Sequence, residues 1–193
     1  ILSKEILSVP EKCCINLHPS LLPKYRGAAP YNWAIINGDK ETGVCVIKLN
    51  EKMDEGEIIN ERRVTINKEE TSAELSGRLS REGAKLLVEA IDLIDAGRER
   101  LKPQDSRKAT YAPKLKKEDG LINWNVDAKR IIGLIRGTQP WPGAYTYLEG
   151  KILKIYKAKE VKEPVKGYKP GTIIKADQKS GLFIAAKGGA LSI

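Results

Sequence analysis

The stretch Cys13-Cys14-Ile15-Asn16-Leu17-His18-Pro19-Ser20-Leu21-Leu22-Pro23 decides how the first part of the chain folds. Its first residues form a short apolar run typical of a buried β-strand, and prolines interrupt regular structure directly afterwards. Alternation along an extended strand places Asn16 and His18 on the same side. Ligands in open α/β sheets bind at the carboxyl ends of strands, so we expect both side chains to face a ligand. The alternative is a lone histidine that a backbone carbonyl satisfies.

A long shaped loop follows this strand. Pro19, Pro23 and the segment Gly27-Ala28-Ala29-Pro30 break regularity before a short helix predicted around Tyr31–Ile36, which Asn37-Gly38 should end. Loops of this length inside a compact domain are usually functional or disordered.

Two further β segments flank an acidic turn. The run Val44–Leu49 predicts a strand, and the stretch from Glu57 to Ile66 predicts one or two more. Between them lies Met53-Asp54-Glu55-Gly56, which we expect at the same sheet edge as His18. An ordinary solvated turn is the alternative for such a segment.

A long amphipathic helix should complete the first domain. Thr71 followed by Glu74 resembles a capping box, and apolar residues then recur at helical spacing until Gly97. These residues are Leu75, Leu79, Leu86, Ala90 and Ile94. The pattern predicts that one face of the helix covers the sheet.

The remainder of the chain predicts a linker and a second domain. Residues 98–117 are charged and contain prolines without sustained periodicity, as in interdomain linkers. Asp127 can cap a helix over Ala128–Ile135. Short strands between glycine-containing turns follow, at residues 145–148, 152–156, 171–174, 182–185 and 190–193. We therefore expect domains at 1–97 and 118–193, the second a small β-barrel.

The net charge of +9 is distributed unevenly. Residues 1–100 carry 15 lysines and arginines against 17 acidic residues, whereas residues 101–193 carry 19 against 8, a net charge of +11. Such asymmetry favours a polyanionic partner for the second half. A lysine-rich, merely solvated surface explains the charge equally well.

Composition disfavours several other classes. The three cysteines, Cys13, Cys14 and Cys45, lack the spacing of a disulfide framework or a thiolate zinc site, and His18 is the only histidine. We therefore expect no metal centre. No apolar run approaches the roughly 20 residues of a membrane-spanning helix, and we expect a cytoplasmic protein.

Together these motifs resemble those of the formyltetrahydrofolate-dependent formyltransferase family. The pattern is Asn-x-His at 16–18, then Ser-Leu-Leu-Pro at 20–23, with Asp54 in an Asp-x-Gly turn downstream. Further segments resemble the branch that acts on methionyl-tRNA, namely residues 20–30, 33–38, 41–44, 110–115, 122–124 and 140–144. The family begins with a βαβ half that has no counterpart here, so we expect the chain to be a fragment.

The resemblance implies a fold, a reaction and a site. The fold is α/β, the C-terminal part of a Rossmann-like formyltransferase domain followed by a small OB-like barrel. The reaction moves the formyl group of 10-formyltetrahydrofolate, without a metal, onto initiator methionyl-tRNA for translation initiation, and we expect a monomer. The catalytic residues would be Asn16, His18 and Asp54, and the folate-binding loop would comprise Ser20, Leu21, Leu22 and Pro23.

Each implied catalytic residue has a chemical role. Asn16 would donate a hydrogen bond to the oxyanion, a contribution of about 3 kcal/mol when such donors are preorganised. His18 would aid the oxyanion and proton transfer. Asp54 would either raise the proton affinity of the imidazole and orient it, or hold a water that relays the proton. Both roles for Asp54 remain open.

Candidate tRNA contacts lie in the basic second half. They are Lys114, Lys116, Lys117, Lys151, Lys154 and Lys157, which would gain affinity by displacing counterions from phosphates. Trp124, Trp141 and Tyr145 could stack on bases, although structural burial is the commoner fate of such aromatics.

Two other functions fit parts of the sequence. Formyltransferases that act on amino groups of nucleotide-linked sugars share the Asn, His and Asp positions and a Pro-Trp-Pro-Gly-Ala segment, here residues 140–144. A non-catalytic nucleic-acid-binding module would retain only the basic half. Residues 27–30, residues 110–115 and the basic tail favour a tRNA acceptor over a sugar.

Overall fold

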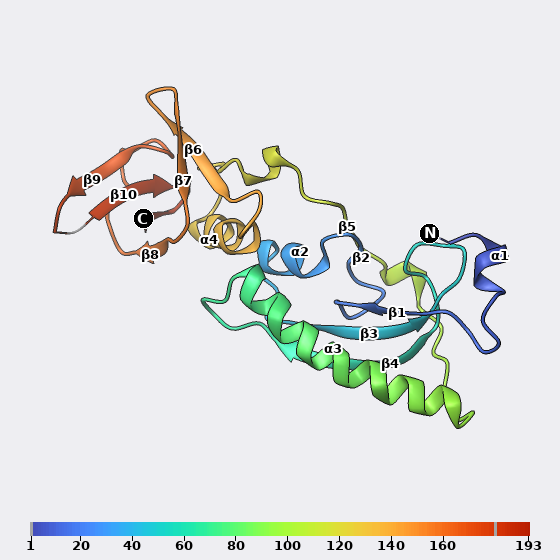
Figure 1. Ribbon diagram of the computed structural model, residues 1–193. Helices are drawn as coiled ribbons and strands as arrows, with labels where there is room; N and C mark the ends of the chain where they lie inside the picture. Colours follow the sequence, from blue (N-terminus) through green and yellow to red (C-terminus); the bar gives the residue numbers. More distant parts are fainter. Residues whose placement is uncertain (1, 180) are drawn as a thin grey trace. The chain divides into compact units, whose positions relative to one another are not determined.

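The computed structural model describes residues 2–179 and 181–193, and the chain divides into two compact units (Figure 1). The first unit comprises Ile1–Ala34 and Asp39–Lys114, and the second comprises Ile35–Gly38 and Leu115–Ile193. Within the described residues, no helix combines the length and apolar character needed to cross a membrane.

A three-stranded antiparallel sheet forms the centre of the first unit. Its order is β1 (Ile15–His18), β3 (Glu41–Lys48) and β4 (Ile58–Thr65). The predicted strands at both ends of the acidic turn are confirmed, and residues 58–65 form one strand rather than two. In β3, the central strand, Thr42 to Ile47 are all buried. His18 lies opposite Cys45, so its strand end is fixed to the core of the sheet.

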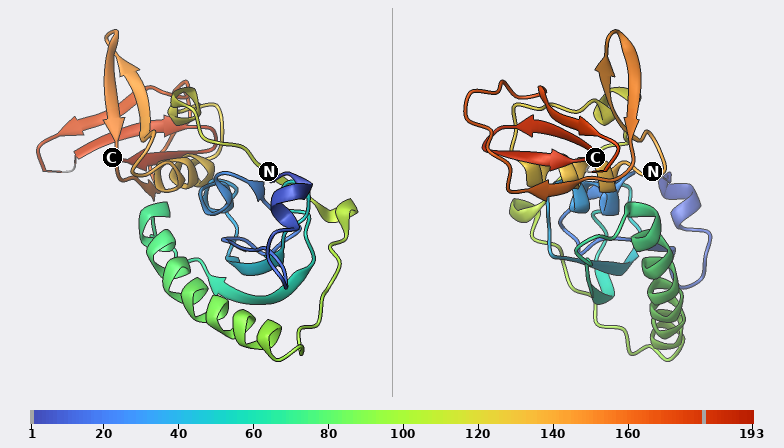
Figure 2. Two further views of the ribbon diagram at one scale, coloured as in Figure 1. Left: turned by 45° about the vertical axis from the view of Figure 1, so that its right-hand side comes forward. Right: turned by 90° about the vertical axis from the view of Figure 1, so that its left-hand side faces the viewer.

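The predicted long helix is α3 (Ser72–Asp95), which contacts β3 and β4 (Figure 2). Its capping box is confirmed, because Thr71 and Glu74 each bind the other's backbone N–H. A Cβ on Gly83 would come within 2.6 Å of Leu17, so α3 covers the Leu17 face of β1. Alternation therefore directs Asn16 and His18 to the opposite face.

The remaining elements of the first 114 residues are short. The predicted helix near residue 31 is α2 (Pro30–Ile36), whereas α1 (Lys4–Leu7), the 3₁₀ turn η1 (Ser106–Lys108) and the parallel pair β2 (Arg26–Gly27) and β5 (Tyr111–Ala112) were not predicted from the sequence. The stretch predicted as a linker is therefore locally structured. The backbone of Lys102 in this stretch also forms an isolated antiparallel β-bridge with Ile58.

The second unit contains α4 (Ala128–Gly137) and six strands in the described part of the chain. Asp127 caps α4 by accepting from the Lys129 N–H at 2.9 Å, as predicted. The strands are β6 (Ala144–Leu148), β7 (Lys151–Ile155), β8 (Lys159–Val161), β9 (Ile173–Asp177), β10 (Gly181–Ala186) and β11 (Gly189–Ser192), preceded by the 3₁₀ turn η2 (Lys117–Gly120).

The pairing of these strands does not confirm the expected small barrel. They form an antiparallel sheet of order β8-β11-β10-β9 and a separate hairpin of β6 and β7, and no closed barrel is found among the described residues. Strand spacing predicts where strands occur, but it does not determine which edges pair. The core of this unit instead gathers around α4, with Ile131, Ile135, Ile155 and Leu191 almost fully buried.

Candidate active site

His18 is held at the end of β1 by one hydrogen bond to the backbone. Its Nε2 lies 2.9 Å from the carbonyl oxygen of Tyr25, and its side chain is only 4% exposed. Because a carbonyl oxygen can only accept, this contact places a proton on Nε2. Nδ1 is therefore the nitrogen that can gain or lose a proton.

Asp54 faces that nitrogen. Its Oδ2 lies 3.6 Å from His18 Nδ1 and accepts a hydrogen bond from the Gly27 N–H at 2.8 Å. The Asp54 side chain is 15% exposed, so it is the more accessible member of the pair. The structure thus brings together two residues that lie 36 positions apart in the sequence, His18 and Asp54.

Burial and charge act in opposite directions on His18. Burial, the larger effect, lowers the pKa of the imidazole, whereas the Asp54 charge and the Tyr25 carbonyl raise it. The net pKa is below the ordinary value of about 6.5, so the resting ring is mainly neutral at pH 7. An imidazolium formed on Nδ1 would be stabilised by the carboxylate beside it.

Asn16 lies two residues earlier on the same face of β1. Its side chain is half-buried, and no hydrogen bond of its carboxamide is recorded among residues 2–179 and 181–193. Its N–H groups therefore remain available to an oxygen of a ligand. Among the described residues, no hydrogen bond joins this carboxamide to His18 or Asp54.

The Ser20–Pro23 loop is largely part of the interior. The Ser20 hydroxyl donates to the Lys24 carbonyl at 2.6 Å and is fully buried, and Leu22 packs with Cys45, Ile47 and Ile58. Leu21 and Pro23 keep partial exposure. Within the loop, these two side chains are the ones that retain surface for a ligand.

Sequence reasoning missed the residues that hold the pair in place. Tyr25 and Gly27 have positive φ values of 62° and 119°, and they present a carbonyl to His18 and an N–H to Asp54. A Cβ at Gly27 would lie 2.7 Å from the Ala112 carbonyl oxygen. The glycine was a usable signal, because only glycine fits this approach at that φ, but nothing in the sequence marked the Tyr25 carbonyl.

The candidate tRNA-binding lysines are all exposed: Lys114, Lys116, Lys117, Lys151, Lys154 and Lys157. The aromatic residues differ from one another. Trp141 is 55% exposed, whereas Tyr145 is 9% exposed and Trp124 is partly buried with its Nε1 donating to Thr146 Oγ1 at 3.0 Å. Trp141 is thus the one of the three that retains a large accessible ring.

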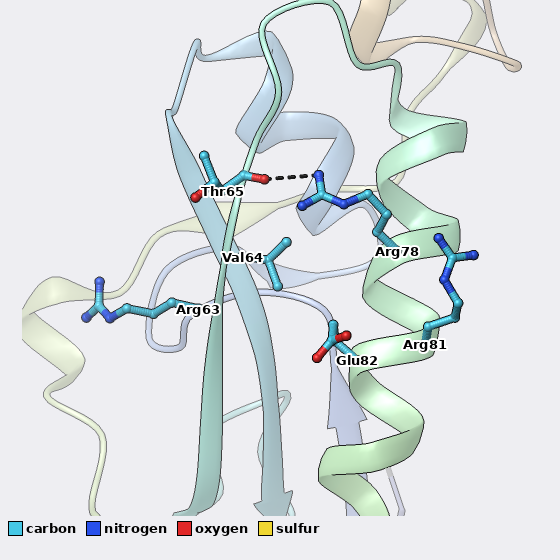
Figure 3. A pocket seen from close by; sticks show the side chains of 6 residues that line it. All are labelled: Arg63, Val64, Thr65, Arg78, Arg81 and Glu82. Carbon is cyan, nitrogen blue, oxygen red and sulfur yellow. Dashed lines mark hydrogen bonds between the residues drawn. The ribbon is translucent and has the colours of Figure 1, made fainter.

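A shallow hollow of about 360 Å³ lies elsewhere in the first unit, between β4 and α3 (Figure 3). Arg78 points from α3 to the Thr65 carbonyl and pairs with Glu70, and Arg63, on the other side of β4, pairs with Glu41. Neither the Asn16–His18 strand end nor the Asp54 turn contributes a lining residue to this hollow, so it is not the candidate site.

A carboxamide two residues before a buried imidazole, with a carboxylate facing that imidazole, suits group transfer accompanied by proton movement. Two family models match the chain. The model described as formyl transferase matches residues 1–91, and the model described as formyl transferase, C-terminal domain, matches residues 114–193. The chain belongs to the formyl transferase family.

Individual relatives agree with this assignment. The chain is 49% identical to a methionyl-tRNA formyltransferase of Thermodesulfovibrio yellowstonii and 45% identical to one of Geotalea uraniireducens, in both cases over 100% of its own length. It covers 61% and 60% of those two relatives. The chain therefore spans about three-fifths of the length of the curated relatives it matches.

Solved structures share the fold at lower identity. An N-formyltransferase from Helicobacter canadensis, in complex with folinic acid and dTDP-3-aminofucose, has a TM-score of 0.73 at 22% identity, covering 92% of this chain and 64% of that one. HypX from Aquifex aeolicus, in complex with tetrahydrofolic acid, has a TM-score of 0.68 at 23% identity, covering 92% and 30%. These likenesses support the α/β formyltransferase fold.

Proposed function

We propose that the gene product containing this chain transfers the formyl group of 10-formyltetrahydrofolate to the amino group of initiator methionyl-tRNA, for translation initiation. The observation that carries the proposal is the His18–Asp54 pair at the end of β1, in a chain 45–49% identical to methionyl-tRNA formyltransferases. The reaction forms a bond from the acceptor nitrogen to the formyl carbon and breaks the bond from that carbon to the folate nitrogen.

Asn16 is suited to the oxygen of the formyl group. As the amine attacks, negative charge develops on this oxygen, and a donor already in place stabilises it by about 3 kcal/mol. The Asn16 carboxamide is half-buried, and no competing partner for it is recorded in the described part of the chain. It can therefore donate without first breaking a protein hydrogen bond.

The His18–Asp54 pair would move the proton. The attacking nitrogen must lose a proton, and the departing folate nitrogen must gain one. Because Asp54 is more exposed than His18, we assign Asp54 to the substrate side of the pair, where it contacts the reacting groups directly or through a water. His18, mainly neutral and oriented by Tyr25, would accept the proton on Nδ1 behind it.

The folate donor would bind beside the loop that follows β1. Both solved neighbours described above hold folate compounds, which supports a folate ligand for this fold. Leu21 and Pro23 would supply apolar contact surface. Ser20 and Leu22 would act indirectly, because the first fixes the loop through Lys24 and the second anchors it in the core.

The second unit would bind the tRNA. Lys151 and Lys154 are exposed on β7, and Tyr147 on β6 lies opposite Ile152 with 57% of its surface exposed. Tyr147 shares a face of the hairpin with Lys154, and Lys151 lies on the other face. An exposed aromatic beside a lysine suits nucleic acid, because lysines contact phosphates and rings stack on bases. Lys116, Lys117 and Lys157 are further exposed lysines of this unit, and Lys114, the last residue of the first unit, is exposed as well.

A formyl-transfer assay tests the proposed function. The full gene product would be given 10-formyltetrahydrofolate with either methionyl-tRNA or a dTDP-linked amino sugar, and formylated product would be counted. We expect formylated methionyl-tRNA and no formylated sugar. Formylated sugar alone would replace the proposed acceptor. Salt-dependent tRNA binding without folate binding or transfer would instead indicate a non-catalytic module.

A further inference from the structure

Gln104 is joined to the turn that carries Asp54 by both ends of its side-chain amide. Its Nε2 donates to the carbonyl oxygens of Asp54 at 2.8 Å and Gly56 at 2.7 Å. Its Oε1 accepts from Arg26, at 3.2 Å from Nε and 2.8 Å from Nη2. Both amide hydrogens and the amide oxygen are therefore used, which fixes the orientation of the group.

Arg26 completes the connection from the other side. Its side chain is 1% exposed, and its Nη1 pairs with Glu55 at 2.8 Å. A buried guanidinium needs partners for its charge and its N–H groups, and here both partners hold the Asp54 turn. Arg26 also precedes Gly27, the residue that donates its N–H to Asp54.

The turn needs such restraint because of its backbone. Asp54 has a φ of 53°, in the left-handed region that residues other than glycine seldom adopt. A Cβ at Gly56 would collide with the Lys48 carbonyl oxygen, so the turn also lies directly against the end of β3. The two bonds from Gln104 oppose relaxation of this backbone.

We propose that Gln104 is a positioning residue, which holds the Asp54 carboxylate against His18 and is held in turn by the buried Arg26. This inference rests on the proposed function only for its effect on catalysis. Gln104 lies in residues 92–113, between the segments that the two family models match. Residues 98–117, which the sequence predicts as a linker, thereby include a residue that positions the candidate active site.

The first readout needs no substrate. In the 193-residue chain His18 is the only histidine, so its ring signals report one pKa by NMR titration. Gln104→Met removes both donors without changing the charge. Because Asp54 raises the pKa of His18, release of the carboxylate should lower that pKa. An unchanged His18 pKa in a folded Gln104→Met variant would overturn the proposal, even if activity fell.

The second readout is a double-mutant cycle on formyl transfer by the full gene product. We expect Gln104→Met to lower kcat roughly ten- to a hundredfold, the scale of a misplaced catalytic group, with KM within about threefold. In an Asp54→Asn background the same substitution should add little, because it acts through Asp54. Equal losses in both backgrounds would contradict the proposal.

Two further variants serve as a substitute for Gln104→Met and as a control. Gln104→Glu retains an acceptor for Arg26 but cannot donate to the turn, and it replaces Gln104→Met in the cycle if the latter does not fold. Gln178→Met, at an exposed position of the second unit, should leave kcat and the His18 pKa unchanged. Absence of formyl transfer in the parent would refute the proposed function alone, since the NMR result stands independently.

Discussion

The site around His18 and the β6–β7 hairpin use their residues in opposite ways. In the first unit His18 is 4% exposed and donates to the Tyr25 carbonyl, and its partner Asp54 accepts from the Gly27 N–H. In the second, Lys151, Lys154 and Tyr147 extend into solvent. Chemistry requires a few groups in one geometry, whereas phosphate binding sums many adaptable contacts. Substitutions near His18 should therefore change kcat, whereas substitutions in the hairpin should change the affinity for tRNA.

His18→Gln should have the largest effect. Loss of a group that transfers protons lowers rates by about 10² to 10⁴-fold, and we expect a loss of that size in kcat with unchanged tRNA affinity. Single-turnover formylation and a filter-binding titration would measure the two. The exposed Lys68 in the first unit offers a control, since Lys68→Gln should change neither. Parental kcat in His18→Gln would exclude the proposed proton transfer.

Asn16→Ala comes next in size. Removal of one oxyanion donor lowers kcat by about 10² to 10³-fold, and the smaller side chain leaves the hydrogen bonds of the His18–Asp54 pair intact. Asn16→Asp is the matched comparison, because it keeps the shape but places negative charge beside the developing oxyanion. Asn16→Asp should therefore lower kcat at least as much as Asn16→Ala does. An active Asn16→Asp would show that the carboxamide is not the donor.

The sequence predicted the parts of this fold that local rules determine. The Thr71–Glu74 capping box and the Asp127 cap depend on residues within one helical turn, and both are present. The β2–β5 pair joins residues 26–27 to residues 111–112. Strands of two residues are too short to show a hydrophobic periodicity, so the sequence did not predict this pair. The OB-like barrel is not confirmed by the strand pairing of the described residues, and the sequence alone does not decide it because strand pairing is a tertiary property.

The residues of the candidate site also include some that the sequence predicted and some that it did not. The sequence predicted that the Asp54 turn lies near His18, and their side chains are 3.6 Å apart. The strand-end rule is not the reason, because β1 and β3 are antiparallel and their carboxyl ends lie at opposite ends of the pair. Gln104 was not found, because a side chain that binds two carbonyl groups about fifty residues away carries no pattern of its own. The roles of Asn16, His18 and Asp54 in catalysis stay predictions.

Loss of two lysines from the hairpin should have a moderate effect confined to binding. The double variant Lys151→Gln/Lys154→Gln removes two candidate phosphate contacts, and each contact contributes about one to the slope of log affinity against log salt. We expect the slope to fall by about two, with kcat at saturating tRNA unchanged. Lys68→Gln again provides the control. A parental slope would move the tRNA-binding surface away from this hairpin.

The smallest expected effect is on stability, and its sign follows from the buried imidazole. The folded-state pKa of His18 lies below the unfolded value of about 6.5, so the unfolded chain binds a proton first as the pH falls. The contribution of His18 is therefore fully present above pH 6.5 and declines as the pH falls through 6.5 to the folded pKa. Urea unfolding between pH 5 and 8 should show a steeper loss for the parent than for His18→Gln, whose residue 18 does not titrate. Parallel curves would mean that Asp54 and Tyr25 offset burial completely, so that the pKa of His18 is not lowered in the folded chain.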